Sequence, residues 1–396
     1  MSSHSTTAQF REEVRGWLTA NVPAGWRERM TGATTEAFIA SQREWMKKLV
    51  GAAYATSHWS KEWPGGGRPL AEQMIIAEEM ARADAPRLLL YFISLYHAAL
   101  TLMEWGTEEQ KLRHLPAILK GEIWCQGFSE PNAGSDLASL KTRAERHGDY
   151  YVVNGQKIWS TLGQYADYCL LLVRTDSTGP KQAGITYLLL DTKSAGIVRR
   201  PIRQMTGDEE FAEIFLENVK VPVANRLGDE NAGWRIAQTT LTSERGLTIL
   251  ELCERLYCAR WRLLCAMGEE DGVVQDDQSR REAVDVFIRI DALRALLNDM
   301  MVKLMAGEDI GGSASFVKLM YAAVLREFSA LGERVGGLQA QISSGFTLGG
   351  GYETGNWAID FMNSYQWTIA GGSNEVQRNI VAERILGMPR EKWFGS

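Results

Sequence analysis

The sequence lacks long hydrophobic runs, blocks of basic residues and paired metal-binding residues. No apolar stretch approaches the roughly 20 residues that a membrane-spanning helix requires. Charged side chains at positions 11–15 interrupt any secretory signal, so a cytoplasmic protein without a membrane segment is expected. With 43 Lys and Arg against 49 Asp and Glu, the formal net charge is −6. This acidic balance argues against a nucleic-acid partner.

Cysteine and histidine are both scarce, with five residues of each. An odd number of cysteines without a CxxC pair indicates reduced, mostly buried thiols. The histidines are dispersed and form no HExxH motif, so no metal site is expected. A hydrophobic fraction of 45% with 23% charged residues is typical of a globular protein, and 396 residues suit two or three domains.

Hydrophobic patterns divide the chain into three regions. Residues 1–122 have apolar residues at helical spacing, and Thr107 followed by two acidic residues predicts a helix start. Residues 123–228 contain short strand-like runs, and Asn154-Gly155 between two of them predicts a hairpin turn. Residues 229–396 contain long periodic segments typical of an antiparallel bundle. The expected fold class is α+β: an N-terminal helical domain, a middle β-barrel domain and a C-terminal antiparallel four-helix bundle.

Four short motifs occur in order along the chain. They are Phe128–Asp136 (FSEPNAGSD), Asn154–Thr161 (NGQKIWST), Ser243–Arg245 (SER) and Ile369–Arg378 (IAGGSNEVQR). In this order and spacing they resemble the acyl-CoA dehydrogenase family of flavoproteins over nearly the whole chain. The resemblance implies an enzyme that removes the α-proton of an acyl-CoA thioester, passes the β-hydride to FAD and forms a trans-2-enoyl-CoA. An aliphatic carbon is a poor hydride donor, and no side chain supplies the strong electron acceptor that it needs.

The resemblance implies that the first two motifs hold the flavin. Ser129 would lie against the polar side of the ring and Ser135 near the acyl-CoA and the flavin phosphates. Trp159 would cover one ring face, and Thr161 would form a hydrogen bond near ring N5. The alternatives are a simple Ser-Glu-Pro turn and a core aromatic residue in a strand. The residues implied in cofactor binding are Gln126, Phe128, Ser129, Gly134, Ser135, Trp159, Ser160, Thr161, Ser373, Asn374 and Glu375.

The third motif supplies the candidate base. Many family members carry a carboxylate in the C-terminal loop, where this sequence has Gly371. In a second subset, which includes isovaleryl- and long-chain-type enzymes, the base lies on a bundle helix at the position of Glu244. Leu241 and Leu247 flank Glu244 at helical spacing, so it can point inward, where loss of water raises the pKa of a carboxylate. The alternative is a surface Glu paired with a basic residue.

The resemblance also implies how the substrate is held. The backbone N–H of Gly371, counted with Glu244 as catalytic, would bind the thioester oxygen as negative charge develops on it. Glycine at 371 and 372 leaves space for a bulky or branched acyl chain. Arg245 would support the base or its helix, and the candidate substrate-binding residues are Ser135, Arg245 and Gly372. Steroid side-chain, medium straight-chain and branched acyl groups all remain open.

Two departures from the family concern the clamp on the flavin pyrophosphate. Homotetrameric members carry an Arg-x-x-Phe-Gly motif where this chain has the acidic stretch 267–274, which would repel phosphate. They also carry a Gln and glycine-rich motif that 346–352 does not match. The expectation is an α2β2 heterotetramer, similar to actinobacterial dehydrogenases that shorten steroid side chains, in which a second acyl-CoA dehydrogenase-like subunit supplies the clamp. Electron-transfer flavoprotein would accept the electrons. Alternatives are a homotetramer, a base-less subunit and a flavin oxidase on the same fold.

Overall fold

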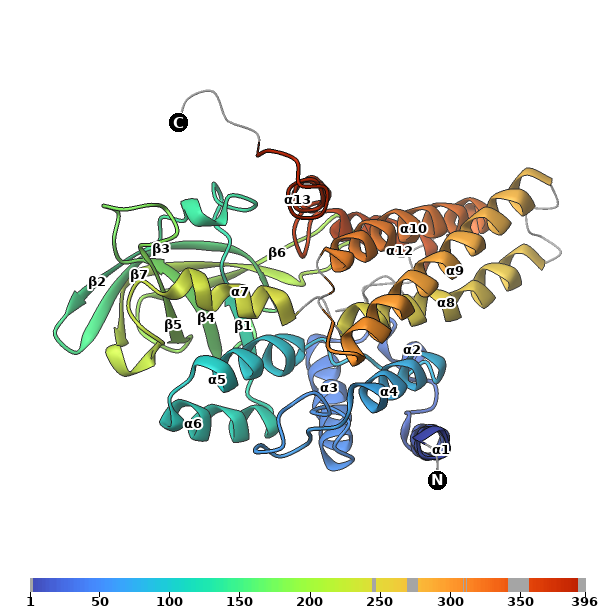
Figure 1. Cartoon of the computed structure of the whole chain (residues 1–396), viewed down its shortest axis with the longest axis horizontal. Helices are drawn as coiled ribbons and strands as arrows, with labels where there is room; N and C mark the ends of the chain where they lie inside the picture. Colours follow the sequence, from blue (N-terminus) through green and yellow to red (C-terminus); the bar gives the residue numbers. More distant parts are fainter. Residues whose placement is uncertain are drawn as a thin grey trace.

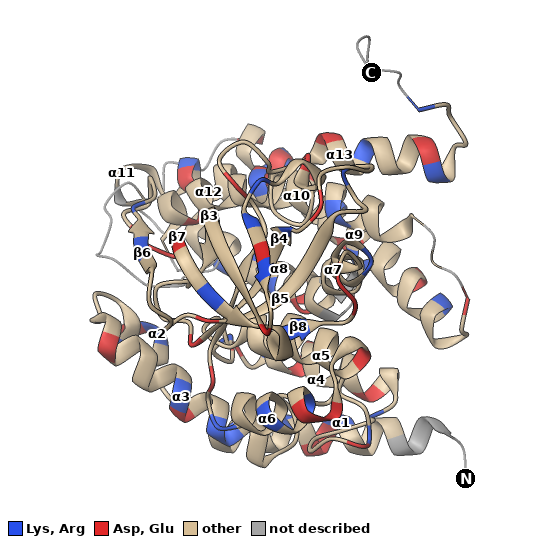
Figure 2. Cartoon of the chain, turned by 90° about the vertical axis from the view of Figure 1, so that its left-hand side faces the viewer, with Lys and Arg blue, Asp and Glu red and all other residues tan. Residues whose placement is uncertain are grey.

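The computed structural model describes residues 3–243, 247–268, 277–308, 310, 312–340 and 356–390. A curled sheet lies at one end of the molecule and a helical bundle at the other, and the N-terminal helices lie beneath both (Figure 1). Lys and Arg are interspersed with Asp and Glu along the helices and strands, so the ribbon shows no large region of one charge (Figure 2). Among the described residues, none of the helices combines the length and the low polarity needed to cross a membrane.

The N-terminal region is helical. Its elements are α1 (Ser3–Asn21), α2 (Trp26–Met30), α3 (Thr35–Gly51), α4 (Leu70–Arg82), the π-helical segment η1 (Ile93–Ala98), α5 (Ala99–Trp105) and α6 (Glu108–Leu119). The predicted helix start at Thr107 is confirmed: its side chain and that of Gln110 form a reciprocal capping box. Helices α1 and α4 are joined at Glu79, a buried carboxylate bonded by Arg11 and Arg15 of α1. This ion-paired joint places α4 where it can pack against the bundle.

The middle region forms one eight-stranded sheet. Its strands are β1 (Trp124–Gly127), β2 (Arg143–His147), β3 (Tyr150–Thr161), β4 (Tyr168–Arg174), β5 (Ile185–Asp191), β6 (Ile197–Ile202), β7 (Phe211–Pro222) and β8 (Arg226–Leu227). They pair in the order β6-β7-β3-β2-β4-β5-β8, and β1 lies parallel to β4. Strands β6 and β8 end this path, so the barrel is open along one seam. Strands β4 and β5 are almost completely buried, which explains their continuous hydrophobic runs.

The hairpin turn predicted at Asn154-Gly155 is wrong. Strand β3 continues through these residues, and its hairpin with β2 turns earlier, beside Gly148. Asn154 and Gly155 lie where β3 changes register against β7. The Asn154 side chain donates to Oδ1 of Asn218 at 3.2 Å and accepts from its backbone N–H at 2.7 Å. A Cβ on Gly155 would lie 2.5 Å from Oγ1 of Thr142. The pair therefore forms a β-bulge that requires glycine for close approach.

The C-terminal region is helical. Its elements are α7 (Gly233–Ser243), α8 (Leu247–Gly268), α9 (Asp277–Met305), α10 (Ser313–Val335), α11 (Gly337–Ala340), α12 (Trp357–Ser364), the 3-10 turn η4 (Tyr365–Thr368), α13 (Asn374–Ile380) and the π-helical turn η5 (Val381–Ile385). Helices α8, α9, α10 and α12 pack on one another as the bundle. Helix α7 instead packs on β5 and α5, where the indole N–H of Trp105 donates to Oγ1 of Thr239 at 2.9 Å.

Two hydrophobic cores result from this packing. The first extends from Phe10 to Ala237 and joins the N-terminal helices, the sheet and α7. The second extends from Ile249 to Trp357 and lies within the bundle. Helix α4 packs against α8 and so bridges the two. Helix α4 is therefore the described element that contributes side chains to both cores.

Candidate functional site

The structure brings the first two motifs together beside strand β3 of the sheet. The backbone N–H of Ile158 donates to the carbonyl oxygen of Ser129 at 3.0 Å. The ammonium group of Lys157, completely buried, donates to the carbonyl of Phe128 at 3.1 Å and to Oε1 of Glu130 at 2.8 Å. Two segments about thirty residues apart in the sequence are thus fixed to each other by a backbone bond and a buried ion pair.

Glu130 organises the loop that carries the first motif. Besides Lys157, its carboxylate accepts the backbone N–H groups of Lys141 at 2.6 Å and Thr142 at 2.8 Å. Burial alone would raise the pKa of Glu130, but the charge and hydrogen bond of Lys157 lower it below its usual range. The sequence analysis assigned no role to Glu130 or Lys157. The available signal was a lysine within a predicted strand, directly before Ile158 and Trp159.

Trp159 has the geometry of a binding residue rather than a core residue. Strand β3 changes register against β7 between Lys157 and Ser160, and Trp159 has a left-handed backbone with φ +63°. Its side chain is 55% exposed and meets the Phe211 ring edge-on at 5.9 Å between centroids. A bulky residue with positive φ is strained, and such strain concentrates at functional sites. The alternative of a core aromatic residue is therefore wrong.

The remaining predicted residues of the β-domain lie around Trp159 and the first motif. Gln126 on β1 has its side-chain nitrogen 2.7 Å from Nδ1 of His97, in the π-helical segment η1. Phe128 is buried and packs against Tyr187. Gly134 and Ser135 are exposed at the tip of the loop. Ser160 is buried and Thr161 is half-buried.

The C-terminal loop is shaped by two glycines. Gly371 and Gly372 have φ of +66° and +92°, which glycine adopts without strain. The side-chain amide of Gln377 donates to the carbonyl of Gly371 at 2.7 Å and holds the loop against α13. Ser373 caps α13 by accepting the N–H of Val376. The loop therefore presents backbone rather than side chain.

Asn374 and Glu375 begin α13 and have partners within the chain. Oδ1 of Asn374 accepts from Nζ of Lys318 at 3.0 Å. Glu375 is exposed, and bonds from its own backbone and Ser373 lower the pKa of its carboxyl group. These two side chains are therefore engaged at the helix start.

Glu210 connects the second motif with the C-terminal loop. Its carbonyl accepts the N–H of Leu162 at 2.6 Å, and its carboxyl group is hydrogen-bonded to Gln366 near Arg87. Burial of the carboxyl group, together with the charge of Asp208, raises the pKa of Glu210 to about 7. The sequence analysis did not identify this residue, because only the fold brings the three segments together.

The motif residues fit FAD in their chemistry. Trp159 offers an exposed aromatic plane, and Thr161 and Ser160 place hydroxyl groups beside it. Oγ of Ser160 is buried and has no hydrogen-bond partner in the described part of the chain, a deficit that a polar ring edge would remove. A Cβ on Gly134 would meet no atom within 4 Å, so a ligand could approach the loop backbone there. FAD would contribute hydride acceptance, which these side chains cannot supply.

Several sequence-based assignments lie outside the described residues. They concern the candidate base Glu244, its neighbour Arg245, most of the acidic stretch 267–274 and the glycine-rich segment 346–352. Helix α7 ends at Ser243 immediately before the first of these, and α8 begins at Leu247 immediately after. The roles of these residues therefore stay predictions.

Comparison with known families covers the chain from end to end. Family models of the acyl-CoA dehydrogenase N-terminal, middle and C-terminal domains match residues 4–122, 125–219 and 231–386. The acyl-CoA dehydrogenase IpdE1 of Mycolicibacterium smegmatis is 37% identical over 398 residues, which cover 97% of this chain and 98% of that protein.

Solved structures show the same full-length likeness. The structure named Tcur3481-Tcur3483 steroid ACAD superposes with a TM-score of 0.84 at 30% identity, covering 98% of each chain. The ChsE4-ChsE5 complex from Mycobacterium tuberculosis has a TM-score of 0.79 at 28% identity, covering 99% of this chain and 100% of that chain. With all three domain families matched in order, the chain belongs to the acyl-CoA dehydrogenase family.

Proposed function

We propose that this chain is the catalytic subunit of a two-subunit acyl-CoA dehydrogenase acting on a bulky, steroid-type acyl group, with Glu244 as its base. Family membership makes the chain an FAD-dependent oxidoreductase that converts an acyl-CoA to a trans-2-enoyl-CoA. The observation that carries the proposed flavin site is the joint held by Lys157. It fixes the loop of Ser129 against the strand of Trp159 in a chain matched over its whole length.

The reaction needs two coordinated events at adjacent carbons. A carboxylate must take the α-proton, while the β-hydride leaves to the flavin, the acceptor that FAD supplies when bound. Glu244 is the carboxylate we assign, because Gly371 provides none in the C-terminal loop. The N–H of Gly371 would then donate to the thioester oxygen and stabilise the negative charge that develops there.

A bulky acyl group suits the open loop and the similar proteins. Gly371 and Gly372 place no side chain over the reacting carbons. A Cβ on Gly372 would lie 2.6 Å from Nε2 of Gln377, so a larger residue would displace the side chain that holds this loop. One similar structure, at 30% identity, carries steroid in its name.

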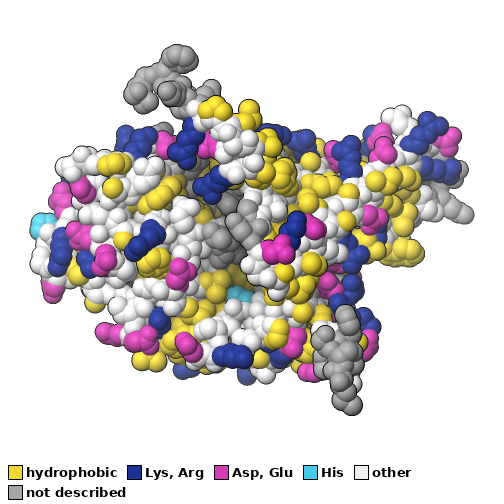
Figure 3. All heavy atoms as spheres, viewed as in Figure 1, with side chains coloured by type: hydrophobic (Ala, Val, Ile, Leu, Met, Phe, Trp, Pro, Cys, Tyr) yellow, Lys and Arg dark blue, Asp and Glu magenta, His cyan; other side chains and the backbone are white. Residues whose placement is uncertain are grey.

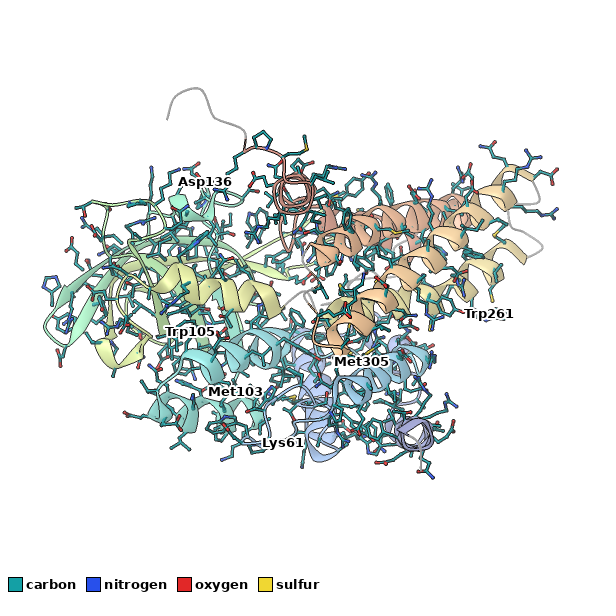
Figure 4. The ribbon with its side chains drawn as sticks, viewed as in Figure 1. Lys61, Met103, Trp105, Asp136, Trp261 and Met305 are labelled. Atoms are coloured by element: carbon teal, nitrogen blue, oxygen red, sulfur yellow. The ribbon has the colours of Figure 1, made fainter. Side chains whose placement is uncertain are left out.

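A second subunit is supported by the surface of the bundle. Large apolar side chains are exposed there, and those on α8 and α9 are Trp261, Leu264, Val284, Ile288, Val302 and Met305. Figure 3 shows hydrophobic side chains gathered over the bundle, and Figure 4 places Trp261 and Met305 at opposite ends of it. Exposed apolar surface of this kind marks protein interfaces. Two similar structures are named as pairs of chains. Electron-transfer flavoprotein is the electron acceptor we propose.

Replacement of Glu244 by Gln tests the assignment of the base. The change is nearly isosteric, so fold and bound FAD are expected to persist, while flavin reduction by acyl-CoA slows by about 10²–10⁴-fold. Stopped-flow bleaching of the flavin measures this rate, and Glu327→Gln, on the exposed surface of the bundle, is the matched control. Bleaching at a rate near that of the wild type would assign the base to another residue.

A further inference from the structure

Three buried hydroxyl groups meet where α7 packs on β5 and α5 (Figure 1). Oγ1 of Thr240 on α7 lies 2.8 Å from Oγ1 of Thr101 on α5 and 3.1 Å from the hydroxyl oxygen of Tyr187 on β5. All three side chains are completely buried. A hydroxyl chain, made of Tyr187, Thr240 and Thr101, therefore joins three separate elements of the fold.

The hydroxyl chain has a direction, because each hydroxyl group has one proton to donate. Thr101 donates to the carbonyl of His97 at 2.7 Å. The oxygen of Thr101 can then accept from Thr240, and the oxygen of Thr240 from Tyr187. Burial raises the pKa of Tyr187 above its usual range, so the phenol keeps its proton and remains a donor. In this order each proton is used once, and the members of a satisfied buried network strengthen one another.

Both ends of the hydroxyl chain reach residues assigned to the flavin. The ring of Phe128, from the first motif, meets the ring of Tyr187 edge-on at 5.8 Å between centroids. His97, whose carbonyl ends the hydroxyl chain, has its Nδ1 2.7 Å from the side-chain nitrogen of Gln126. His97 lies in the π-helical segment η1, and such segments often occur at functional sites. The hydroxyl chain therefore ties α7 to the part of the molecule that would hold the flavin ring.

Thr240 lies in the last turn of α7. The helix ends at Ser243, and the candidate base Glu244 is the next residue, four after Thr240 in the sequence. The hydrophobic effect that packs α7 on the sheet is non-directional, whereas hydrogen bonds fix both distance and angle. The hydroxyl chain therefore sets where the polypeptide leaves α7 and enters the segment of the base.

The neighbouring residue Thr239 offers a comparison on the same turn. Its hydroxyl accepts the indole N–H of Trp105 at 2.9 Å and donates to Oε1 of Glu104 at 3.2 Å. Thr239 is only partly buried. These bonds also hold α7 on α5, but neither of them leads to a residue assigned to the flavin.

We infer that Thr240, Tyr187 and Thr101 are positioning residues for proton abstraction, which hold the end of α7 so that Glu244 meets the α-carbon beside the flavin. The inference rests on the proposed function, because it takes Glu244 as the base. A displacement of about 1 Å in a reacting group can cost roughly 100-fold in rate. Such a loss affects the chemical step rather than substrate binding. These hydroxyl groups act through the helix and need no contact with the substrate or the flavin.

Thr240→Val tests the inference, because valine keeps the size and branching of threonine but has no hydroxyl group. Thr240→Ser keeps a hydroxyl group, and Thr239→Val is the matched control. Stopped-flow bleaching of each FAD-loaded holoenzyme by cyclohexylpropanoyl-, octanoyl- and isovaleryl-CoA gives a limiting rate and a half-saturating concentration. Thr240→Val should lower the limiting rate by about 10–100-fold and leave half-saturation within about threefold of the wild-type value. Thr240→Ser and Thr239→Val should bleach within about threefold of the wild-type rate.

Tyr187→Phe approaches the hydroxyl chain from the sheet. It removes the first donor and keeps the aromatic ring that Phe128 contacts, so it should slow bleaching as Thr240→Val does. With the acyl-CoA deuterated at the α-carbon, both variants should show at least the wild-type isotope effect, because proton abstraction is the step that has slowed. Melting curves identify any variant that does not fold, and if Thr240→Val fails to fold, Tyr187→Phe decides by the same criteria.

Bleaching by Thr240→Val near the wild-type rate, or an equal loss of rate in Thr239→Val, overturns the inference, since the hydroxyl chain would then only support the fold. Loss of the isotope effect also overturns it, because the defect would lie in another step. Glu244→Gln separates the inference from the proposed function. Slow bleaching in Glu244→Gln with normal bleaching in Thr240→Val overturns the inference alone. Normal bleaching in Glu244→Gln, or no bleaching of the wild type by any of the three thioesters, overturns the proposed function and the inference with it.

Discussion

The two walls of the proposed site are held in different ways. The β-domain wall is fixed within the chain, by the Lys157–Glu130 ion pair and by backbone bonds to Ser129, Lys141 and Thr142. The bundle wall presents a glycine loop that the side chain of Gln377 holds, and its outer face leaves large apolar groups exposed. The first wall is completed by folding, whereas the second has surface left for a partner.

The same contrast applies to the two cores. The core shared by the N-terminal helices and the sheet is closed on all sides by those elements, and most of its side chains are fully buried. The bundle core is also well buried, but Trp261 on α8 is 71% exposed and Ile288 on α9 is 60% exposed. We therefore expect the first core to be stable in this chain alone, and the stability of the second to depend also on assembly.

Lys157→Met should produce the largest change, because it breaks the joint of the β-domain wall. Glu130 would keep a buried negative charge without its cation, and removal of one partner of such a pair costs about 3–5 kcal/mol of unfolding free energy. Urea unfolding of the holoenzyme measures this loss. Lys181→Met is the matched control, since Lys181 pairs with Asp136 at the surface and should cost less than about 1 kcal/mol. Equal losses of unfolding free energy in the two variants would show that the Lys157–Glu130 ion pair does not stabilise the β-domain wall.

Assembly tests the bundle wall and should show the next largest effect. Expressed alone, the chain should retain little FAD, because the acidic stretch 267–274 makes a self-supplied phosphate clamp implausible. Co-expression with an acyl-CoA dehydrogenase-like chain that carries Arg-x-x-Phe-Gly should restore about one FAD per pair of unlike chains. Replacing Trp261 by Ser should weaken that pairing by about 2 kcal/mol or more if Trp261 is a central contact. Flavin absorbance and light scattering measure both effects.

A stable homotetramer of this chain alone with one FAD per subunit would contradict the two-chain assembly. It would leave the dehydrogenase assignment unaffected, since that rests on the family. The exposed Arg143 of β2, distant from the bundle in sequence, offers a matched control in Arg143→Ser. That variant should assemble as the wild type does.

Local signals in the sequence predicted most of the architecture. The helix start at Thr107 depends on neighbours within one turn, and the buried strands β4 and β5 are themselves continuous apolar runs. The Asn154-Gly155 prediction failed because a bulge and a tight turn require the same residues, and only the pairing of β3 with β7 decides between them. The propensity of Asn-Gly describes a local backbone conformation, and the pairing of strands decides whether that conformation forms a turn or a bulge.

The residues of the candidate site show the same difference between local signals and tertiary pairing. Trp159 and Ser129 could be predicted as site residues because they lie in compact motifs, and the structure brings those motifs together through Ile158 and Lys157. Arg87 and Glu210 carry no motif, and their proximity arises from three segments far apart in the sequence. Residues of this kind could not be predicted, because each one reads locally as an ordinary charged residue near a loop.

Trp159→Gly should separate ligand binding from folding in the β-domain wall. Glycine adopts the positive φ of this position without strain, and the exposed ring contributes little to the core. The thermal stability of the FAD-free protein should therefore be unchanged. Loss of the aromatic contact should weaken FAD binding by about 0.5–1.5 kcal/mol, or roughly 2–10-fold in affinity. Flavin titration and a melting curve measure the two quantities. A large fall in melting temperature with unchanged flavin affinity would show that Trp159 stabilises the fold and does not contact the flavin.

Glu210→Gln should have the smallest effect, and it probes the seam where the two walls meet. The pKa of Glu210 is raised to about 7 from 4.5, so the native state binds a proton that the unfolded chain has released at intermediate pH. The stability that Glu210 contributes is therefore full below about pH 4.5 and is lost as the pH rises towards 7. Gln cannot titrate, so the difference in unfolding free energy between wild type and variant should fall across that window and level off above it.

Urea unfolding at several pH values measures this difference. The subtraction cancels the contribution of all other carboxylates, and the adjacent Glu209→Gln serves as control. A difference that stays constant between pH 5 and 7 would mean that the carboxyl group is ionised throughout, and that the seam between Gln366 and Arg87 is open to water.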